Sequence, residues 1–199
     1  MRSLHIISHP DFFEREEEVI IELLERYEVM MHIRKPEALE SDYIQFIQQI
    51  PEAFYPRIIL HSAYYLATKF DFAALHFSTS KRELVNDVLP QSLKSTSCHA
   101  LAEVKSLSGE FSSCFLSPIF SSISKEGYAG NLDLEAVKGY LSQDRNIEVI
   151  ALGGIDAENI RQVSAMGFDS AAVLGAVWGR CPHYGEDFNS RVEALLKAI

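Results

Sequence analysis

Basic and hydroxyl side chains recur at one kind of position in this sequence, at or just after the ends of short apolar runs. Arg34 and Lys35 stand at the end of the run at 29–34, and Lys125 follows several serines after the run at 113–119. A guanidinium binds a phosphate through two parallel hydrogen bonds, whereas an ammonium supplies a point charge. Brought together, these residue types would make a site for a small phosphorylated ligand.

Histidines occupy equivalent positions on other runs. His32, His61, His76 and His99 each lie near the end of an apolar run, and Ser97 lies two residues before His99. Histidine titrates near neutrality and can give or take a proton. A single histidine on a buried strand is more often a hydrogen-bonded core residue. The convergence of four at equivalent positions therefore indicates an acid or base among them.

Two glycine-containing turns add backbone donors. Gly153 and Gly154 close one apolar run, and Leu174 and Gly175 lie in the next run along the chain. Backbone amides of such turns form the usual phosphate cradle of parallel α/β barrels. The alternative is a purely structural role, in which the glycines only permit a tight turn between strand and helix.

Eight apolar, β-prone runs must position these residues, and amphipathic stretches with helical periodicity lie between them. Alternating strands and helices are typical of a parallel sheet with right-handed crossovers. Eight units of about 25 residues favour a closed (β/α)8 barrel, or TIM barrel, over an open doubly wound sheet. We expect one domain over residues 1–199. The predicted strands are 4–8, 29–34, 57–62, 72–77, 95–100, 113–119, 148–154 and 170–177. The predicted helices are 13–27, 42–50, 64–70, 84–89, 101–107, 132–141, 157–166 and 187–199.

Composition excludes several classes of protein. The formal net charge of −10 argues against nucleic acid and anionic membrane surfaces as partners. No apolar run reaches the roughly 20 residues that span a bilayer, and the N-terminus lacks a secretion signal. Cys98, Cys114 and Cys181 are widely spaced, which predicts free thiols in a reducing cytoplasm. We expect a cytoplasmic protein that binds neither nucleic acid nor membrane; a homo-oligomer stays open.

Five motifs, in order, resemble the thiamine phosphate synthase family, which includes a thiazole tautomerase branch. They are HIRKP (32–36), SCHALAEV (97–104), SPIFSSISKEGY (117–128), IALGGI (150–155) and GFDSAAVLGAV (167–177). The likeness covers nearly the whole chain and implies a (β/α)8 barrel. Family synthases join hydroxymethylpyrimidine diphosphate to thiazole phosphate and release diphosphate. The resemblance therefore implies a transferase of thiamine biosynthesis with small phosphorylated pyrimidine and thiazole substrates.

The resemblance also implies roles for individual residues. Arg34 and Lys125 match residues that bind the diphosphate, Ser97 matches a serine on the pyrimidine side, and His32 replaces a family glutamine. These four are the expected catalytic residues. The expected phosphate- and substrate-binding residues are Lys35, His61, His99, Ser122, Ser124, Gly153, Gly154, Leu174 and Gly175.

The sequence departs from the family where a metal would bind. The family's Asn-Asp pair falls on His61 and Ser62, and a second aspartate falls on or near Lys81. Mg²⁺ usually takes one or two carboxylates plus substrate phosphate. We therefore predict no metal ligands, and Mg²⁺ stays open only as the family's usual cofactor. Either Lys35, Lys81 and His61 replace its charge, or the chain does not run the synthase step. The alternatives are a thiazole phosphate tautomerase, whose proton-transfer histidine falls on Pro118, and a non-catalytic binder of thiamine intermediates.

Overall fold

Eight parallel strands close into a barrel in the computed structural model, which describes residues 1–87, 92–107, 109–120 and 132–199. The strands are β1 (Leu4–Ile7), β2 (Val29–Ile33), β3 (Ile58–Leu60), β4 (Ala74–Phe77), β5 (Lys94–Cys98), β6 (Ser113–Leu116), β7 (Glu148–Leu152) and β8 (Ser170–Val173). Each strand pairs with its neighbours in sequence, and β1 pairs with β8 to close the ring. The predicted (β/α)8 barrel is confirmed.

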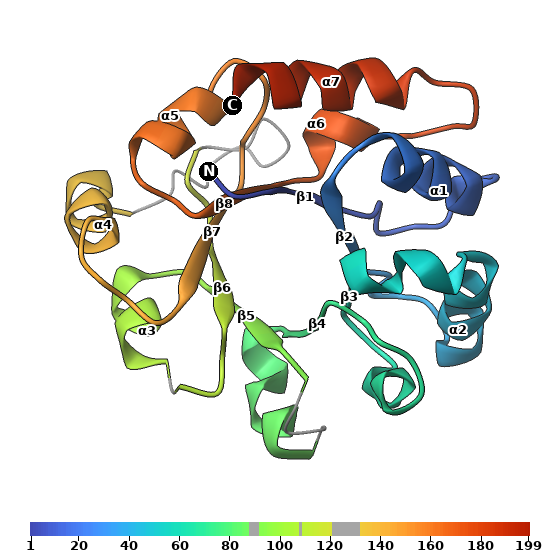
Figure 1. The fold of residues 1–199 in the computed structure, drawn as a ribbon, viewed down its shortest axis with the longest axis horizontal. Coiled ribbons are helices and arrows are strands. Elements are labelled where there is room, and N and C mark those ends of the chain that lie inside the picture. Colours follow the sequence, from blue (N-terminus) through green and yellow to red (C-terminus); the bar gives the residue numbers. More distant parts are fainter. Residues whose placement is uncertain (88–91, 108, 121–131) are drawn as a thin grey trace.

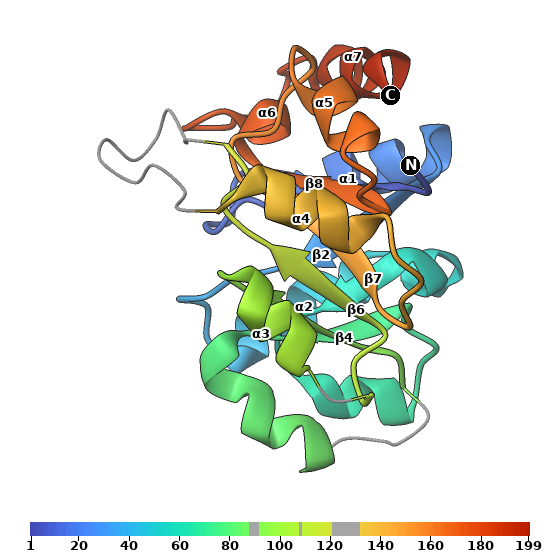
Figure 2. The same ribbon diagram turned by 90° about the vertical axis from the view of Figure 1, so that its left-hand side faces the viewer.

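Helices surround the strands. Figure 1 shows them around the outside of the strand ring, and Figure 2 shows the same ring from the side. The α-helices are α1 (Glu16–Arg26), α2 (Glu40–Gln49), α3 (Leu101–Ser106), α4 (Leu134–Leu141), α5 (Ile160–Ala165), α6 (Gly175–Trp178) and α7 (Phe188–Ala198). Short 3₁₀ helices span Glu52–Arg57, Tyr64–Thr68 and Thr79–Asp87. None of the helices in the described part of the chain has the length and apolarity that crossing a bilayer requires.

All eight predicted strands exist, although several are shorter than predicted. The largest difference is at the eighth, where the backbone leaves the extended region at Leu174 and Gly175–Trp178 forms α6. Val177 and Trp178 are fully buried in this helix. A short apolar run is equally compatible with a buried strand and a buried helix, so the pattern alone could not separate the two.

The barrel interior is only partly apolar. The apolar cluster inside the ring is small and consists of Ile7, Phe115, Ile150 and Ala172, with Leu152 and Leu174 beside it. The main apolar core lies on the other face of the strands, against the helices. Alternate residues of a strand face opposite sides of a sheet, so polar residues fill the remaining inward positions. Those polar residues must find hydrogen-bond partners inside the barrel.

The C-terminal helices close the outer ring against the N-terminal ones. The Trp178 indole donates to the backbone carbonyl of Ile7 at 2.6 Å, and its ring packs on Phe188 with centroids 5.2 Å apart. Asn189 Nδ2 donates to Glu22 Oε1 at 3.0 Å, which joins α7 to α1. These contacts hold the first and last units of the barrel together.

A buried ion pair ties the start of α1 to the end of β2. Lys35 Nζ lies 2.5 Å from Glu16 Oε2, and both side chains are fully buried. The same ammonium donates to the carbonyls of His9 and Asp11, at 2.8 and 3.0 Å. Burial raises the pKa of Glu16 to about 7, while the partner charge lowers it. The pair therefore holds the loop between β1 and α1 in place.

Removing one member of this pair should strongly destabilise the protein. We expect Lys35→Met to lower the free energy of unfolding by about 3–5 kcal/mol, because Glu16 would be buried without a partner. The double variant Glu16→Leu/Lys35→Met should be less damaging, because no buried charge then remains. Urea unfolding measures both values. Lys197→Met, which removes the exposed pair with Glu193, is the control and should change little. A double variant at least as unstable as Lys35→Met alone would contradict this account.

Candidate functional site

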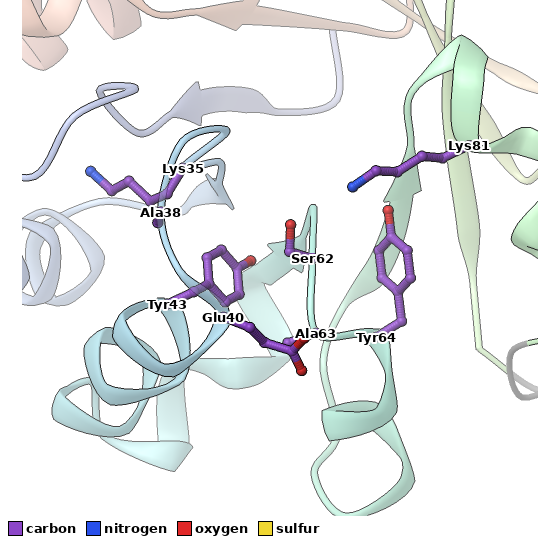
Figure 3. Close-up of a pocket in the computed structure, with 8 residues that line it drawn as sticks. All are labelled: Lys35, Ala38, Glu40, Tyr43, Ser62, Ala63, Tyr64 and Lys81. Atoms are coloured by element: carbon purple, nitrogen blue, oxygen red, sulfur yellow. The ribbon is translucent and has the colours of Figure 1, made fainter.

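The C-terminal ends of β2, β3 and β4 bring cations and hydroxyls to one mouth of the barrel. Arg34 follows β2, His61 and Ser62 follow β3, and Lys81 lies in the 3₁₀ helix after β4. A pocket of about 200 Å³ opens beside them, and Figure 3 shows the Lys81 ammonium directed toward the hydroxyls of Ser62 and Tyr64. Burial, the neighbouring His76 ring and then the charges of Arg34 and Lys81 lower the pKa of His61. Both charges therefore act on that ring.

Arg34 combines a fixed backbone with an exposed side chain. The hydroxyl of Ser8, a fully buried residue, accepts from the Arg34 amide at 2.9 Å and donates to its carbonyl at 3.1 Å. Within the described residues, the Arg34 guanidinium makes no ion pair or hydrogen bond. Its charge is thus available to a ligand at the mouth.

Lys35 is placed differently from the sequence expectation. Its ammonium has three N–H donors, and all three are used on Glu16, His9 and Asp11. Figure 3 shows this side chain directed away from Ser62 and Lys81. No donor is left for a phosphate, so the structure gives Lys35 a structural role.

His32 lies deeper than the mouth. It is 1% exposed, and both of its ring nitrogens are hydrogen-bonded within the barrel. Nδ1 lies 3.0 Å from His61 Nε2, and Nε2 lies 2.9 Å from His5 Nδ1. His32 therefore hydrogen-bonds to His61 from inside the barrel and is not accessible to a ligand at the mouth.

His76 links His61 to Ser97. The rings of His61 and His76 are stacked, with centroids 4.3 Å apart. His76 Nε2 lies 2.9 Å from the Ser97 hydroxyl, and Nδ1 lies 2.5 Å from the Ser95 hydroxyl. Ser97 is only partly buried. The structure thus brings the expected Ser97 and His61 into one network through a histidine between them.

Burial keeps these histidines uncharged at neutral pH. It lowers the pKa of His5 to about 4 and that of His76 to about 3. It lowers the pKa values of His32 and His61 well below the ordinary histidine value. Each neutral imidazole has one N–H donor and one acceptor nitrogen.

The donors at this site do not fit Mg²⁺. Within the described residues, the one group of three or more potential metal ligands is His32, His61 and His76, whose nitrogens lie within 4.8 Å of one another. Mg²⁺ prefers oxygen ligands, whereas imidazole suits transition metals. The ring nitrogens of His32 and His76 are also already used in hydrogen bonds. Ser62 and Lys81 stand where the family resemblance places carboxylates, and Lys81 adds a positive charge there.

The Gly153–Gly154 turn packs tightly against the segment that follows β6. A Cβ on Gly154 would lie 2.8 Å from the Phe120 carbonyl oxygen, and one on Gly153 would lie 2.8 Å from Pro118. Both glycines also have positive φ angles. The turn therefore needs glycine for conformation and for packing. The chain after Phe120 enters 121–131, so the predicted Ser122, Ser124 and Lys125 lie outside the described residues.

The remaining expected residues lie at neighbouring strand ends. Leu174 precedes α6, and Gly175 is its first residue, with open space where a side chain would stand. His99 is exposed, and its Nδ1 lies 3.1 Å from the Ser117 carbonyl oxygen. His99 thus joins the ends of β5 and β6 on the same side of the barrel.

Sequence reasoning missed several polar residues of the barrel interior. His5 bonds to His32, and Glu148 and Ser170 bond to each other at 2.6 Å at the opposite end of the barrel. The signal was present, because His5 lies two residues before Ile7 and Glu148 two before Ile150, on the inward face. Attention to strand ends alone passed over these positions.

Comparison with known proteins agrees with this architecture. A family model described as "Thiamine monophosphate synthase" matches residues 4–177. The thiamine-phosphate synthase of Latilactobacillus sakei subsp. sakei (strain 23K) is 28% identical over 146 residues, which cover 71% of this chain and 65% of that protein. The thiamine-phosphate synthase of Anoxybacillus flavithermus is 29% identical over 117 residues, covering 58% of this chain and 54% of that protein. The matched segments thus span less than two thirds of either relative.

Solved structures match over nearly the full chain. A thiamine phosphate pyrophosphorylase from Bacteroides thetaiotaomicron has a TM-score of 0.77 and 27% identity, with 98% of this chain and 95% of that chain covered. A thiamine phosphate pyrophosphorylase from Pyrococcus furiosus has a TM-score of 0.80 at 20% identity, covering 98% of this chain and 94% of that chain. The second likeness establishes the fold alone.

The buried histidines predict acid sensitivity. Unfolded histidine titrates near pH 6.5, whereas His5 takes up a proton in the fold only near pH 4 and His76 only near pH 3. Between those values the unfolded chain binds protons that the folded chain does not, so stability present above pH 6.5 is lost as the pH falls. Each such ring contributes about 1.4 kcal/mol per pH unit.

Urea unfolding at pH 7, 6 and 5 measures this dependence. The variant His5→Leu/His32→Leu should show a shallower loss, because two of the four rings are gone. An equal free energy of unfolding at pH 7 and pH 5 would show that the rings are not held neutral.

The two glycine turns should respond differently to a methyl group. Gly154→Ala should cost about 2 kcal/mol or more, because φ is +64° and the new Cβ meets Phe120. Gly175→Ala is the matched control and should be neutral or stabilising by up to about 1 kcal/mol, since its site is open and helical. Thermal unfolding compares the two variants. Equal effects would mean that the packing against Phe120 is unimportant.

Proposed function

The chain belongs to the thiamine monophosphate synthase family, and on that premise we propose that it joins hydroxymethylpyrimidine diphosphate to thiazole phosphate, releasing diphosphate. The observation that carries this proposal is the pair of cations at the mouth, Arg34 and Lys81. The reaction breaks the bond between the pyrimidine methylene carbon and the diphosphate oxygen, and the thiazole nitrogen forms the new bond to that carbon. Such a step needs positive charge held in place around the leaving group.

Arg34 is the proposed primary ligand of the diphosphate. Its guanidinium can form two parallel hydrogen bonds to phosphate oxygens, and Ser8 fixes the backbone that carries it. Lys81 adds a second charge across the mouth, and Lys125 is a proposed third by its match to the family motif. Lys35 leaves the proposed set because Glu16 and two carbonyls occupy its ammonium.

These cations take the place of metal charge in the proposal. The family resemblance places Mg²⁺ ligands where this chain has His61, Ser62 and Lys81, and those donors do not suit that ion. The proposed reaction therefore has no step that a metal performs. The prediction is that turnover depends on Arg34 and Lys81 more than on added Mg²⁺.

The neutral histidines suit a reaction that develops positive charge on carbon. A protonated ring beside the pyrimidine would repel that charge, whereas burial keeps His61 and His76 uncharged. Ser97 is proposed to contact the pyrimidine, as its match to the family serine implies. Its bond to His76 supports this orientation.

The thiazole phosphate is proposed to bind on the β6–β8 side of the mouth. The expected residues there are Ser122, Ser124, Gly153, Gly154, Leu174 and Gly175. The backbone of the two glycine turns can approach a phosphate closely, because the glycines carry no side chain. His99, at the end of β5, is proposed to border this part of the site.

We also propose that residues 1–199 form one domain that works in the cytoplasm on small phosphorylated substrates. The contacts of α7 with α1 and α6 support a single closed unit. The curated relatives carry the synthase name, and no contact in the described residues favours the tautomerase or the non-catalytic binder.

Incubation of the purified protein with both substrates, with and without Mg²⁺, tests the function. We expect thiamine phosphate by mass analysis and release of one diphosphate per product. Arg34→Ala should reduce kcat/KM at least tenfold, because the leaving group loses its bidentate ligand. Arg161→Ala, an exposed arginine on α5, is the matched control and should leave the rate unchanged. Absence of thiamine phosphate under both conditions would refute the synthase. Conversion of thiazole phosphate alone would instead identify a tautomerase.

A further inference from the structure

A continuous line of hydrogen bonds crosses the barrel from its N-terminal end to its mouth. At the far end, the hydroxyl of Ser170 lies 2.6 Å from Glu148 Oε1 and 3.0 Å from the Ser3 hydroxyl. The Ser3 hydroxyl lies 2.9 Å from His5 Nε2. The proposed reaction does not use Glu148, Ser170 or Ser3, all of which lie at the barrel end opposite the mouth.

The carboxylate determines which way the first protons point. A carboxylate oxygen accepts, so the Ser170 hydroxyl donates to Glu148. Each hydroxyl has a single proton, so Ser170 must accept from Ser3. Ser3 has then used its own proton and must accept from His5, whose N–H is therefore on Nε2. Every donor in this part of the line points toward Glu148.

The same reasoning continues through the histidines. His5 is uncharged, so its Nδ1 carries a lone pair and accepts from His32 Nε2 at 2.9 Å. His32 is uncharged as well, so its Nδ1 accepts from His61 Nε2 at 3.0 Å. One proton on each ring is thereby placed. The remaining nitrogen, His61 Nδ1, is left with a lone pair.

We propose that Glu148, acting through Ser170, Ser3, His5 and His32, holds His61 as the Nε2–H tautomer and so makes its Nδ1 a hydrogen-bond acceptor for a ligand N–H at the mouth. In this assignment His61 is the residue that meets the ligand, and the other five are positioning residues. The ligand class is a nitrogen heterocycle with an N–H donor.

A free hydrogen-bond acceptor at His61 Nδ1 would differ from the side chains around it at the mouth. Arg34 and Lys81 supply only donors there. The Ser62 hydroxyl donates to the His61 carbonyl oxygen, and the Tyr64 hydroxyl lies 2.8 Å from the His76 carbonyl oxygen and 3.1 Å from that of His61, so both hydroxyl protons are used on backbone carbonyls. In the part of the chain that the structure describes, His61 Nδ1 makes no hydrogen bond. A ligand bound by its phosphates to the cations would present its ring to this acceptor. This identification of the ligand rests on the proposed function. The group that would donate to His61 Nδ1 is then the exocyclic amine of the aminopyrimidine substrate.

Imidazole ¹⁵N NMR of the ligand-free protein at pH 7 tests the tautomers directly. We expect His5, His32 and His61 each to show a protonated Nε2 and an unprotonated Nδ1. A protonated Nδ1 on His61, or a doubly protonated ring, would overturn the inference. This readout needs no turnover, so it is independent of the synthase assay.

Ser170→Ala tests whether Glu148 sets the direction. The substitution disconnects Ser3 from the carboxylate, so Ser3 can donate to His5 and the line can reverse. We expect a measurable fraction of His61 to change to the Nδ1–H tautomer. Ser113→Ala, an inward serine whose side chain has no hydrogen bond among the described residues, is the matched control and should leave His61 unchanged. An unchanged His61 in Ser170→Ala would refute the role of Glu148.

Binding of the free aminopyrimidine alcohol tests the acceptor. We expect titration of this compound to shift the ¹⁵N resonance of His61 Nδ1, and an analogue lacking the amino group to bind about tenfold more weakly. Equal affinities with no shift at Nδ1 would refute the acceptor. If His61 has the expected tautomer but the protein makes no thiamine phosphate, the synthase proposal is refuted and the line of hydrogen bonds stands.

Discussion

The hydrogen bond between His32 and His61 connects the closed interior of the barrel to its mouth. A buried imidazole that lacks a partner costs about 1–3 kcal/mol, so each ring in the interior must bond to another group. The inward positions of β1, β2 and β4 and the residue just after β3 supply histidines, and the inward positions of β5 and β8 supply serines. The hydrogen bonds of these inward side chains therefore form one continuous line that reaches a carboxylate at the other end of the barrel.

Two neighbouring cations after β2 differ in burial. Lys35 is fully buried and is neutralised by Glu16, so its charge holds the fold together. Arg34 is the residue immediately before it, yet its side chain is exposed and its guanidinium is free within the described residues. Successive residues leaving a strand point to opposite sides, which places one charge under the surface and the other at the mouth. Only the second charge is available to a ligand.

The glycine turns contribute backbone groups to the mouth of the barrel without adding charge. The turn at Gly153 and Gly154 lets the chain after β6 approach the end of β7 within van der Waals contact. That contact positions the last described residues before 121–131 at the rim of the barrel. The mouth thus combines cations on the β2–β4 side with backbone groups of the glycine turns on the β6–β8 side.

The sequence by itself determined the barrel, because β-prone runs and helical periodicity are local signals repeated eight times. It also placed Arg34, His61, Ser97 and the glycine turns at the ends of strands, since strand ends are readable from the runs that precede them. Only the tertiary structure decided the fate of Lys35, whose partner Glu16 lies 19 residues earlier on another element. It alone joined His5 to His32 and Ser3 to Ser170, because such contacts depend on strand register and barrel closure. Burial and pairing are set by residues distant in sequence, so no local pattern could separate a charge free for a ligand from one held within the fold.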